Sequence, residues 1–152
     1  MLRTVLNDAL KKAMLAKDTR SVSTIRLILA ALKDRDLAAR GKGHAEGIDE
    51  AEILQMLHSM MKQRHDSIVL YEQGGRPELA RQEEEEIEVI RRFLPRQLGD
   101  DEIAEAVAAT IEELGATGIK DMGRVMATLR ERHAGSMDFA KAGAAVKGRL
   151  AG

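Results

Sequence analysis

Apolar residues recur every three or four positions along almost the whole chain, which is the spacing that places them on one face of a helix. In the first segment, Leu2, Leu6, Leu10 and Ala13 follow this rule. The chain contains only two Phe and one Tyr, whereas helix formers such as Ala, Leu and Met are abundant. No segment alternates apolar and polar residues as a half-buried strand does. The sequence therefore predicts an all-α fold.

Glycine and proline residues divide this pattern into seven segments. Helices are expected at about 2–16, 21–39, 49–73, 77–94, 100–114, 119–132 and 138–150. The Gly-rich stretch from Gly41 to Gly47 is expected to be a mobile loop. Pro95 cannot continue a helix and pushes Leu94 towards an extended conformation, so a domain boundary is expected there. Residues 1–94 would form an N-terminal bundle of about four helices, and residues 95–152 a small three-helix domain.

Composition limits the kind of protein and its compartment. The chain has no cysteine, which excludes a disulfide framework, a cysteine-bound zinc ion and a catalytic thiol. The first residues contain no apolar stretch of the signal-peptide type, and the longest apolar run, 27–32, is too short to cross a bilayer. The sequence therefore favours a cytoplasmic protein with no membrane partner.

No residue pattern indicates catalysis or metal binding. The run Glu83 to Glu86 cannot converge on one ion, because consecutive helix residues point in different directions, and it is interpreted as a solvated face. His58 and His65 are seven positions apart, and the sequence contains no Glu-x-x-His motif. Activated-serine motifs and phosphate-binding glycine loops are also missing. We therefore predict no catalytic residue, no metal and no cofactor.

Charge is segregated along the chain. Residues 1–43 carry ten Lys or Arg against four Asp or Glu, residues 44–102 carry seven against fifteen, and residues 115–152 carry seven against three. A basic helical face can follow a phosphate backbone, although ordinary solubility explains the same balance equally well. With so few aromatic residues for base stacking, contacts would be to an RNA backbone, and no DNA partner is expected. The candidate phosphate contacts are Lys120, Arg124, Lys141 and Lys147.

Several short motifs occur together in a fixed order. They are Thr24-Ile25-Arg26-Leu27, Lys62-Gln63-Arg64, Phe93-Leu94-Pro95-Arg96-Gln97-Leu98, Gly115-Ala116, and Asp121-Met122-Gly123-Arg124-Val125-Met126. On these residues the chain resembles stand-alone YqeY-like proteins of the GatB/YqeY domain family. We interpret most of the motif residues as structural: Phe93, Leu94, Pro95, Leu98, Gly115, Asp121, Met122, Gly123, Val125 and Met126. Gly123 is expected to allow close helix contact, leaving Arg124 free to meet a ligand.

The resemblance implies a function as well as a fold. The same module is similar to the C-terminal tail of the GatB subunit of the glutamine-dependent aspartyl/glutamyl-tRNA amidotransferase, where it helps to hold the tRNA. The family label of a carbon–nitrogen ligase with glutamine as amido donor would describe that assembly, since this chain has no kinase-like domain or amidase Ser–Lys machinery. We therefore expect a non-catalytic adaptor whose partner is tRNA or a tRNA-processing protein. The alternatives are a protein-interaction module whose acidic third and fourth helices meet a basic partner, and an accessory part of an amidotransferase.

Overall fold

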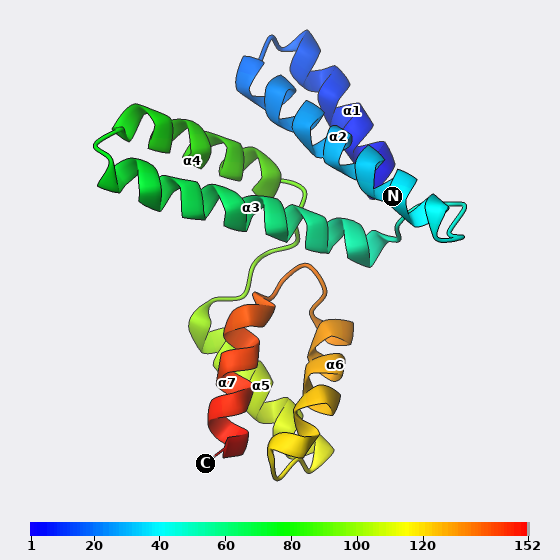
Figure 1. The fold of residues 1–152 in the computed structure, drawn as a ribbon, viewed down its shortest axis with the longest axis vertical. Coiled ribbons are helices and arrows are strands. Elements are labelled where there is room, and N and C mark those ends of the chain that lie inside the picture. The colour runs from blue at the N-terminus through cyan, green and yellow to red at the C-terminus, as the bar shows by residue number, and fades with distance from the viewer. Residues whose placement is uncertain (152) are drawn as a thin grey trace. The chain divides into compact units, whose positions relative to one another are not determined.

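The structure, a computed structural model, describes residues 1–151, and these residues form helices and no strand (Figure 1). The all-α fold predicted from the periodicity is confirmed. The elements are α1 (Leu2–Leu15), α2 (Thr19–Gly41), α3 (Glu50–Gln73), α4 (Pro77–Arg91), α5 (Asp100–Leu114), the short 3-10 helix η1 (Ile119–Asp121), α6 (Met122–Arg132) and α7 (Phe139–Ala151). None of the helices in this part of the chain is long and apolar enough to cross a membrane.

The helices belong to two compact units, Met1–Pro95 (unit 1) and the residues from Arg96 onward (unit 2). The Phe93-to-Leu98 motif supplies core residues to both. Phe93 and Leu94 pack against the core of unit 1, and Leu98 packs into the core of unit 2. Pro95 lies between them, where a residue without a backbone N–H breaks no helix hydrogen bond. The motif thus combines two apolar anchors with a helix stop.

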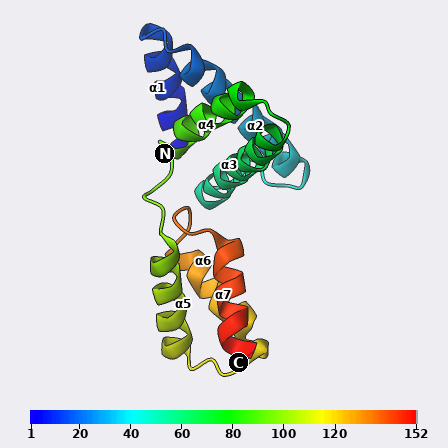
Figure 2. The same ribbon diagram turned by 90° about the vertical axis from the view of Figure 1, so that its left-hand side faces the viewer.

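Unit 1 consists of two helical hairpins, α1–α2 and α3–α4 (Figures 1 and 2). Their shared core includes Leu6 of α1, Ile28 of α2, Met56 and Leu57 of α3, and Ile90 of α4. Each of these side chains is completely buried. Burial of such a side chain contributes about 1.5–3 kcal/mol relative to exposure, so this cluster is the main source of stability in unit 1.

An ion pair fastens the α2–α3 loop to α1 and α2. Arg3 donates to both carboxylate oxygens of Asp36 and to the carbonyl of Ile48 at 2.6 Å, while Asp36 accepts the Ile48 N–H at 2.9 Å. The Arg3 guanidinium lowers the pKa of the buried Asp36 carboxyl. Gly47 has a φ of +86° and lies so close that a Cβ there would collide with Asp36 Oδ1. The expectation of a mobile loop up to Gly47 is therefore wrong at its C-terminal end.

The glutamate run on α4 is more than a solvated face. Glu86 is mostly buried and pairs with Arg64 of α3 at 2.9 Å and Arg20 of α2 at 3.8 Å, and Glu85 pairs with Arg20 at 3.1 Å. Burial and the neighbouring Glu86 raise the pKa of Glu83. Two of the glutamates thus connect three helices, which corrects the interpretation of the run as a solvated face.

Unit 2 packs α5, α6 and α7 around one small core. Its completely buried members are Val107 of α5, Val125 and Leu129 of α6, and Ala142 and Val146 of α7. Gly115 ends α5 in the left-handed conformation at φ +62°, the conformation that glycine adopts most readily at a helix C-terminus. The backbone N–H groups of α7's first turn donate to Asp138 at 2.9 and 3.2 Å, which is the contact that an N-cap aspartate makes.

Candidate nucleic-acid interface

The basic side chains predicted to bind phosphate all lie in unit 2, on three elements. Lys120 is in η1, Arg124 in the first turn of α6, and Lys141 and Lys147 in α7. Helices α6 and α7 pack against each other and α7 also contacts η1. Figures 1 and 2 agree that the last turn of α7 and the segment leading into α6 lie at the same end of the unit. We call this end, defined by Lys120, Lys147 and Arg149, the basic end.

Lys120 is held in place by the turn around it. Asp121 accepts the backbone N–H groups of Thr117 at 3.0 Å and Gly118 at 3.4 Å, and the Thr117 bond is the main reason that the pKa of Asp121 is lowered. The backbone on either side of Lys120 is therefore fixed, whereas its own side chain is exposed and makes no ion pair within residues 1–151. Its ammonium group is available to an anion.

Arg124 is used inside the unit. Its guanidinium donates to the Leu114 carbonyl at 2.9 Å and to Asp121 at 3.2 Å, which ties the start of α6 to the end of α5. The expectation that Arg124 is free to meet a ligand is thus wrong for this structure. The reason is that Asp121, three residues earlier, and the uncapped carbonyl of a helix end both lie within reach of the side chain.

The two lysines of α7 are separated in space. Lys141 pairs with Asp100 at the start of α5 at 3.0 Å, and this contact raises the pKa of Lys141. Lys147 is six residues later, which is about 9 Å along the helix and about 120° around it. Lys147 is exposed and makes no ion pair with the residues that the structure describes. Of the four predicted contacts, Lys120 and Lys147 are thus the two at the basic end with unneutralised charges.

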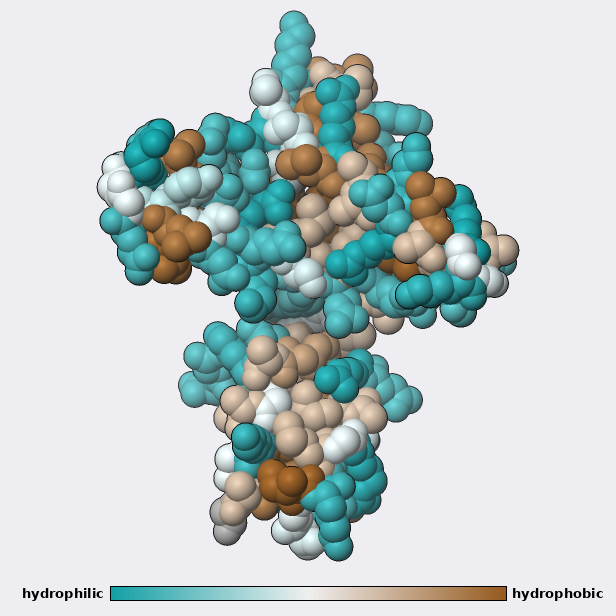
Figure 3. All heavy atoms as spheres, viewed as in Figure 1, coloured by the Kyte–Doolittle hydropathy of each residue, from teal (hydrophilic) through white to brown (hydrophobic). Residues whose placement is uncertain are grey.

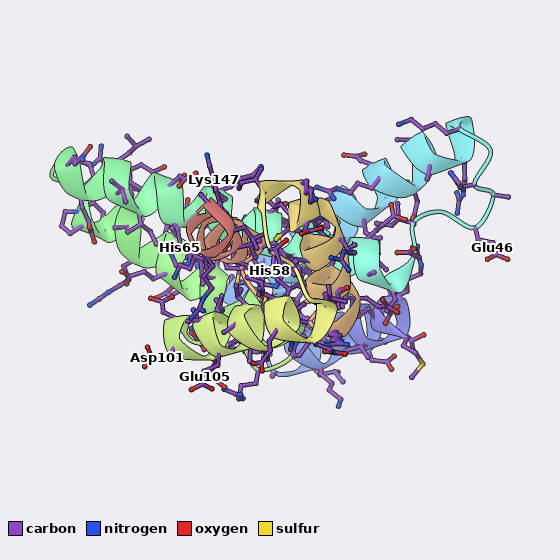
Figure 4. All side chains as sticks on the ribbon, turned by 90° about the horizontal axis from the view of Figure 1, so that it is seen from below. Glu46, His58, His65, Asp101, Glu105 and Lys147 are labelled. Atoms are coloured by element: carbon purple, nitrogen blue, oxygen red, sulfur yellow. The ribbon has the colours of Figure 1, made fainter. Side chains whose placement is uncertain are left out.

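Two acidic side chains of α5 point away from the helix into solvent, as Figure 4 shows for Asp101 and Glu105. Further along α5, Glu113 binds Arg132 of α6 through two contacts of 2.6 and 2.7 Å. This pair removes Arg132 from the basic groups available to a partner. Arg130 covers the ring of Phe139 at 5.9 Å from its centroid, a cation–π geometry. The acidic helix thus neutralises part of the basic pair that follows it.

Arg149 is a member of the basic end that sequence reasoning did not select. It is exposed in the last turn of α7 and makes no ion pair within the described chain. Arg149 lies three residues after the core residue Val146, and this spacing does not indicate that Arg149 lies at the same end of unit 2 as Lys120. That neighbourhood depends on the packing of η1 against α7, which the sequence pattern does not encode.

The histidines do not form a metal cluster. His58 and His65 lie two turns apart on α3 (Figure 4), and His58 makes an interaction of its own. Glu46, also labelled there, points away from the α2–α3 loop. Within residues 1–151 no group of three or more His, Asp or Glu side chains could hold a metal ion.

The fold and its exposed cations define an all-helical protein of two units with a basic end on the second. A profile of the family described as Yqey-like protein matches residues 3–150, almost the entire chain. The chain therefore belongs to the family of Yqey-like proteins, as the motif order indicated.

Curated relatives cover less of the chain. A protein of Lachancea thermotolerans, named Altered inheritance of mitochondria protein 41, mitochondrial, is 37% identical over 89 residues, which are 59% of this chain and 46% of the relative. Proteins of the same name from Saccharomyces cerevisiae (strain YJM789) and Clavispora lusitaniae are 33% identical over 90 residues and 35% identical over 109 residues. The match to the Saccharomyces protein covers 59% of this chain and 46% of that relative. The match to the Clavispora protein covers 70% of this chain and 61% of that relative. The chain thus spans about half the length of the first two relatives.

These names contradict the expectation of a cytoplasmic protein, because the relatives are named as mitochondrial proteins. The expectation rested on composition and on the N-terminal residues. Targeting segments are separate from the folded region, so the residues that form the helices carry no information about the compartment.

Proposed function

We propose that this protein is a non-catalytic adaptor that holds tRNA through the basic end of unit 2. The observation that carries the proposal is the set of exposed cations without ion pairs at this end, Lys120, Lys147 and Arg149. The resemblance of the module to the tRNA-holding tail of an amidotransferase subunit supports the choice of tRNA over other polyanions. No chemistry is required of the chain itself in this role.

Phosphate contacts suit this surface better than base contacts. Lysine ammonium groups on flexible stems act as point charges toward phosphates and release the counterions condensed on the nucleic acid. The two Phe residues of the chain are both partly buried in cores, so neither offers a free ring for stacking. Binding is therefore expected to depend on salt and on RNA shape rather than on sequence.

The four predicted contacts contribute unequally in this proposal. Lys120 and Lys147 approach a phosphate with their charge intact. Arg124 and Lys141 first exchange Asp121 and Asp100 for the phosphate, and Lys141 lies away from the basic end. Exposed ion pairs of this kind contribute only about 0–1 kcal/mol, so the exchange is feasible but yields less net affinity.

Titration of the purified protein with bulk tRNA at several salt concentrations tests the proposal. We expect binding at low salt that weakens steadily as salt rises, with a slope that corresponds to a few phosphate contacts. Absence of binding at low salt contradicts it. A partner captured equally well after nuclease treatment would favour the alternative of a protein-interaction module.

A further inference from the structure

Exposed apolar side chains are concentrated on the first hairpin of unit 1. Of the nine large apolar side chains that are exposed in residues 1–151, six lie on α1–α2 or at its start: Met1, Val5, Met14, Leu15, Leu27 and Leu37. Leu27 and Leu37 remain 48% and 53% exposed although they lie on a helix whose other face is buried. In Figure 3, apolar brown residues and polar teal residues lie interspersed over the part of the surface where Figure 1 places this hairpin.

The same hairpin carries the largest excess of positive charge in the chain. Only Arg3 and Arg20 of its basic residues form ion pairs within residues 1–151. The basic residues without an ion pair are Lys11, Lys12, Lys17, Arg26, Lys33, Arg35, Arg40 and Lys42. Two of the four acidic residues are committed elsewhere, Asp18 as the N-cap of α2 and Asp36 to Arg3. Asp8 and Asp34 alone remain as exposed acids.

Helical spacing leaves both kinds of side chain on the solvent-exposed side of α2. On α2, Arg26, Lys33 and Arg40 recur every seven residues, so they form a stripe with steps of about 10 Å along the axis. Leu37 lies roughly 40° around the helix from Lys33, and Leu27 lies roughly 100° from Arg26, on the other flank of the face opposite the buried residues of α2. We call this surface the outer face of α2.

Helix α1 also exposes basic and apolar side chains. Arg3 marks the flank of α1 that faces the rest of unit 1, because its side chain donates to Asp36 and to the Ile48 carbonyl. Val5 and Lys12 lie roughly 160–180° around the helix from Arg3, on the outward flank. Both hairpin helices therefore expose apolar and basic side chains to solvent.

We propose that the outer face of the α1–α2 hairpin docks on an anionic membrane surface. Clusters of several Lys and Arg residues are attracted by acidic headgroups, and neighbouring apolar side chains enter the boundary between headgroups and acyl chains. Such attachment requires no spanning helix. An RNA backbone would use the cations but would gain nothing from exposed Leu27 and Leu37, so the interleaving favours a lipid surface. This inference concerns unit 1 and does not depend on the tRNA proposal.

Co-sedimentation with lipid vesicles tests the inference on the full chain. The probes are phosphatidylcholine vesicles with and without phosphatidylserine. We expect binding only to the anionic vesicles, with a decrease of about twenty-five-fold in the partition coefficient for the double variant Arg26→Gln/Lys33→Gln, because each cation near the surface contributes about fivefold. The double variant Leu27→Ser/Leu37→Ser should also bind more weakly.

A matched control separates this surface from general stickiness. Val69 and Leu70 on α3 are 51% and 68% exposed, so Val69→Ser/Leu70→Ser removes a similar apolar area from the other hairpin. It should leave vesicle binding unchanged. All the altered side chains are exposed, and circular dichroism verifies that each variant remains helical. No binding to anionic vesicles at low salt overturns the proposal. Unchanged binding after Leu27→Ser/Leu37→Ser also overturns it, and indicates that the cations serve another polyanion such as RNA.

Discussion

Arg96 donates through both arms of its guanidinium to Glu102, at 3.0 and 2.7 Å, immediately after the Pro95 break. Glu102, the N3 residue of α5, also accepts the backbone N–H of the N-cap residue Gly99 at 3.1 Å, which is the carboxylate half of a capping box. These two bonds, the arginine contact first, lower the pKa of Glu102 from 4.5 to about 2. One carboxylate thus holds both Arg96 and the first backbone N–H of the α5 start at the entry into unit 2.

The pH dependence of this contact has a definite sign. Because the pKa of Glu102 is lower in the folded state, the contact stabilises the protein above the ordinary value of 4.5 and is lost as pH falls towards 2. Melting temperatures of the wild type and Glu102→Gln should therefore differ above pH 4.5 and converge in acid. A difference that stays constant with pH, or a Glu102 pKa near 4.5 by carboxyl NMR titration, would contradict this account.

Gly47→Ala should destabilise unit 1 by more than about 1 kcal/mol. The new Cβ would collide with Asp36 Oδ1, and the φ of +86° disfavours any side chain. Gly43→Ala is the matched control, because Gly43 has a φ of +95° and open space around it. Urea unfolding of both variants separates two costs. Both variants bear the cost of a side chain at positive φ, and only Gly47→Ala adds the cost of the collision with Asp36. Equal losses would mean that the Asp36 contact imposes no constraint.

Asp36→Ala should cost about 1–3 kcal/mol of unfolding free energy, because Arg3 and the Ile48 N–H lose their shared acceptor. Arg3→Met removes the unpaired cation, so the double variant should lose less than the sum of the two single variants. Chemical denaturation of the four proteins completes this cycle. Strict additivity would show that the two side chains act independently.

Gly123→Ala should stabilise unit 2 by about 0.5 kcal/mol. Residue 123 is helical in the folded protein, and alanine loses less backbone entropy than glycine when it enters a helix. The structure corrects the expectation of a close helix contact here: Gly123 is exposed and a Cβ would meet nothing within 4 Å. Thermal unfolding measures the change. Destabilisation by alanine would restore the original interpretation.

Helix positions could be predicted because they depend on local patterns. Asp49 caps α3 through the Glu52 N–H at 2.8 Å, and α5 begins and ends at the residues expected from Gly99 and Gly115. α2 begins at Thr19, two residues earlier than the expected start at about Ser21, because Asp18 is its N-cap. Signals of this kind span a few residues, which is the range over which periodicity and capping residues act.

Partners distant in sequence could not be predicted. Arg3 and Asp36 are 33 residues apart, and neither position differs in pattern from an ordinary surface charge. The same holds for Arg124, whose acceptor at Leu114 is ten residues away, and for Arg149, which joins the basic end only through the packing of α7 on η1. Which cations stay available to a ligand is therefore decided by tertiary contacts, and composition alone overestimated the available charge of unit 2.

The salt dependence of tRNA binding tests the central claim most directly. The slope of log affinity against log salt concentration is measured for the wild type, for Lys120→Gln/Lys147→Gln, and for Lys62→Gln as a control on α3. Each lost phosphate contact lowers the magnitude of this slope by about 1, so the double variant should lose about 2 and the control nothing. An unchanged slope in Lys120→Gln/Lys147→Gln would contradict the assignment of the basic end as the tRNA-binding surface.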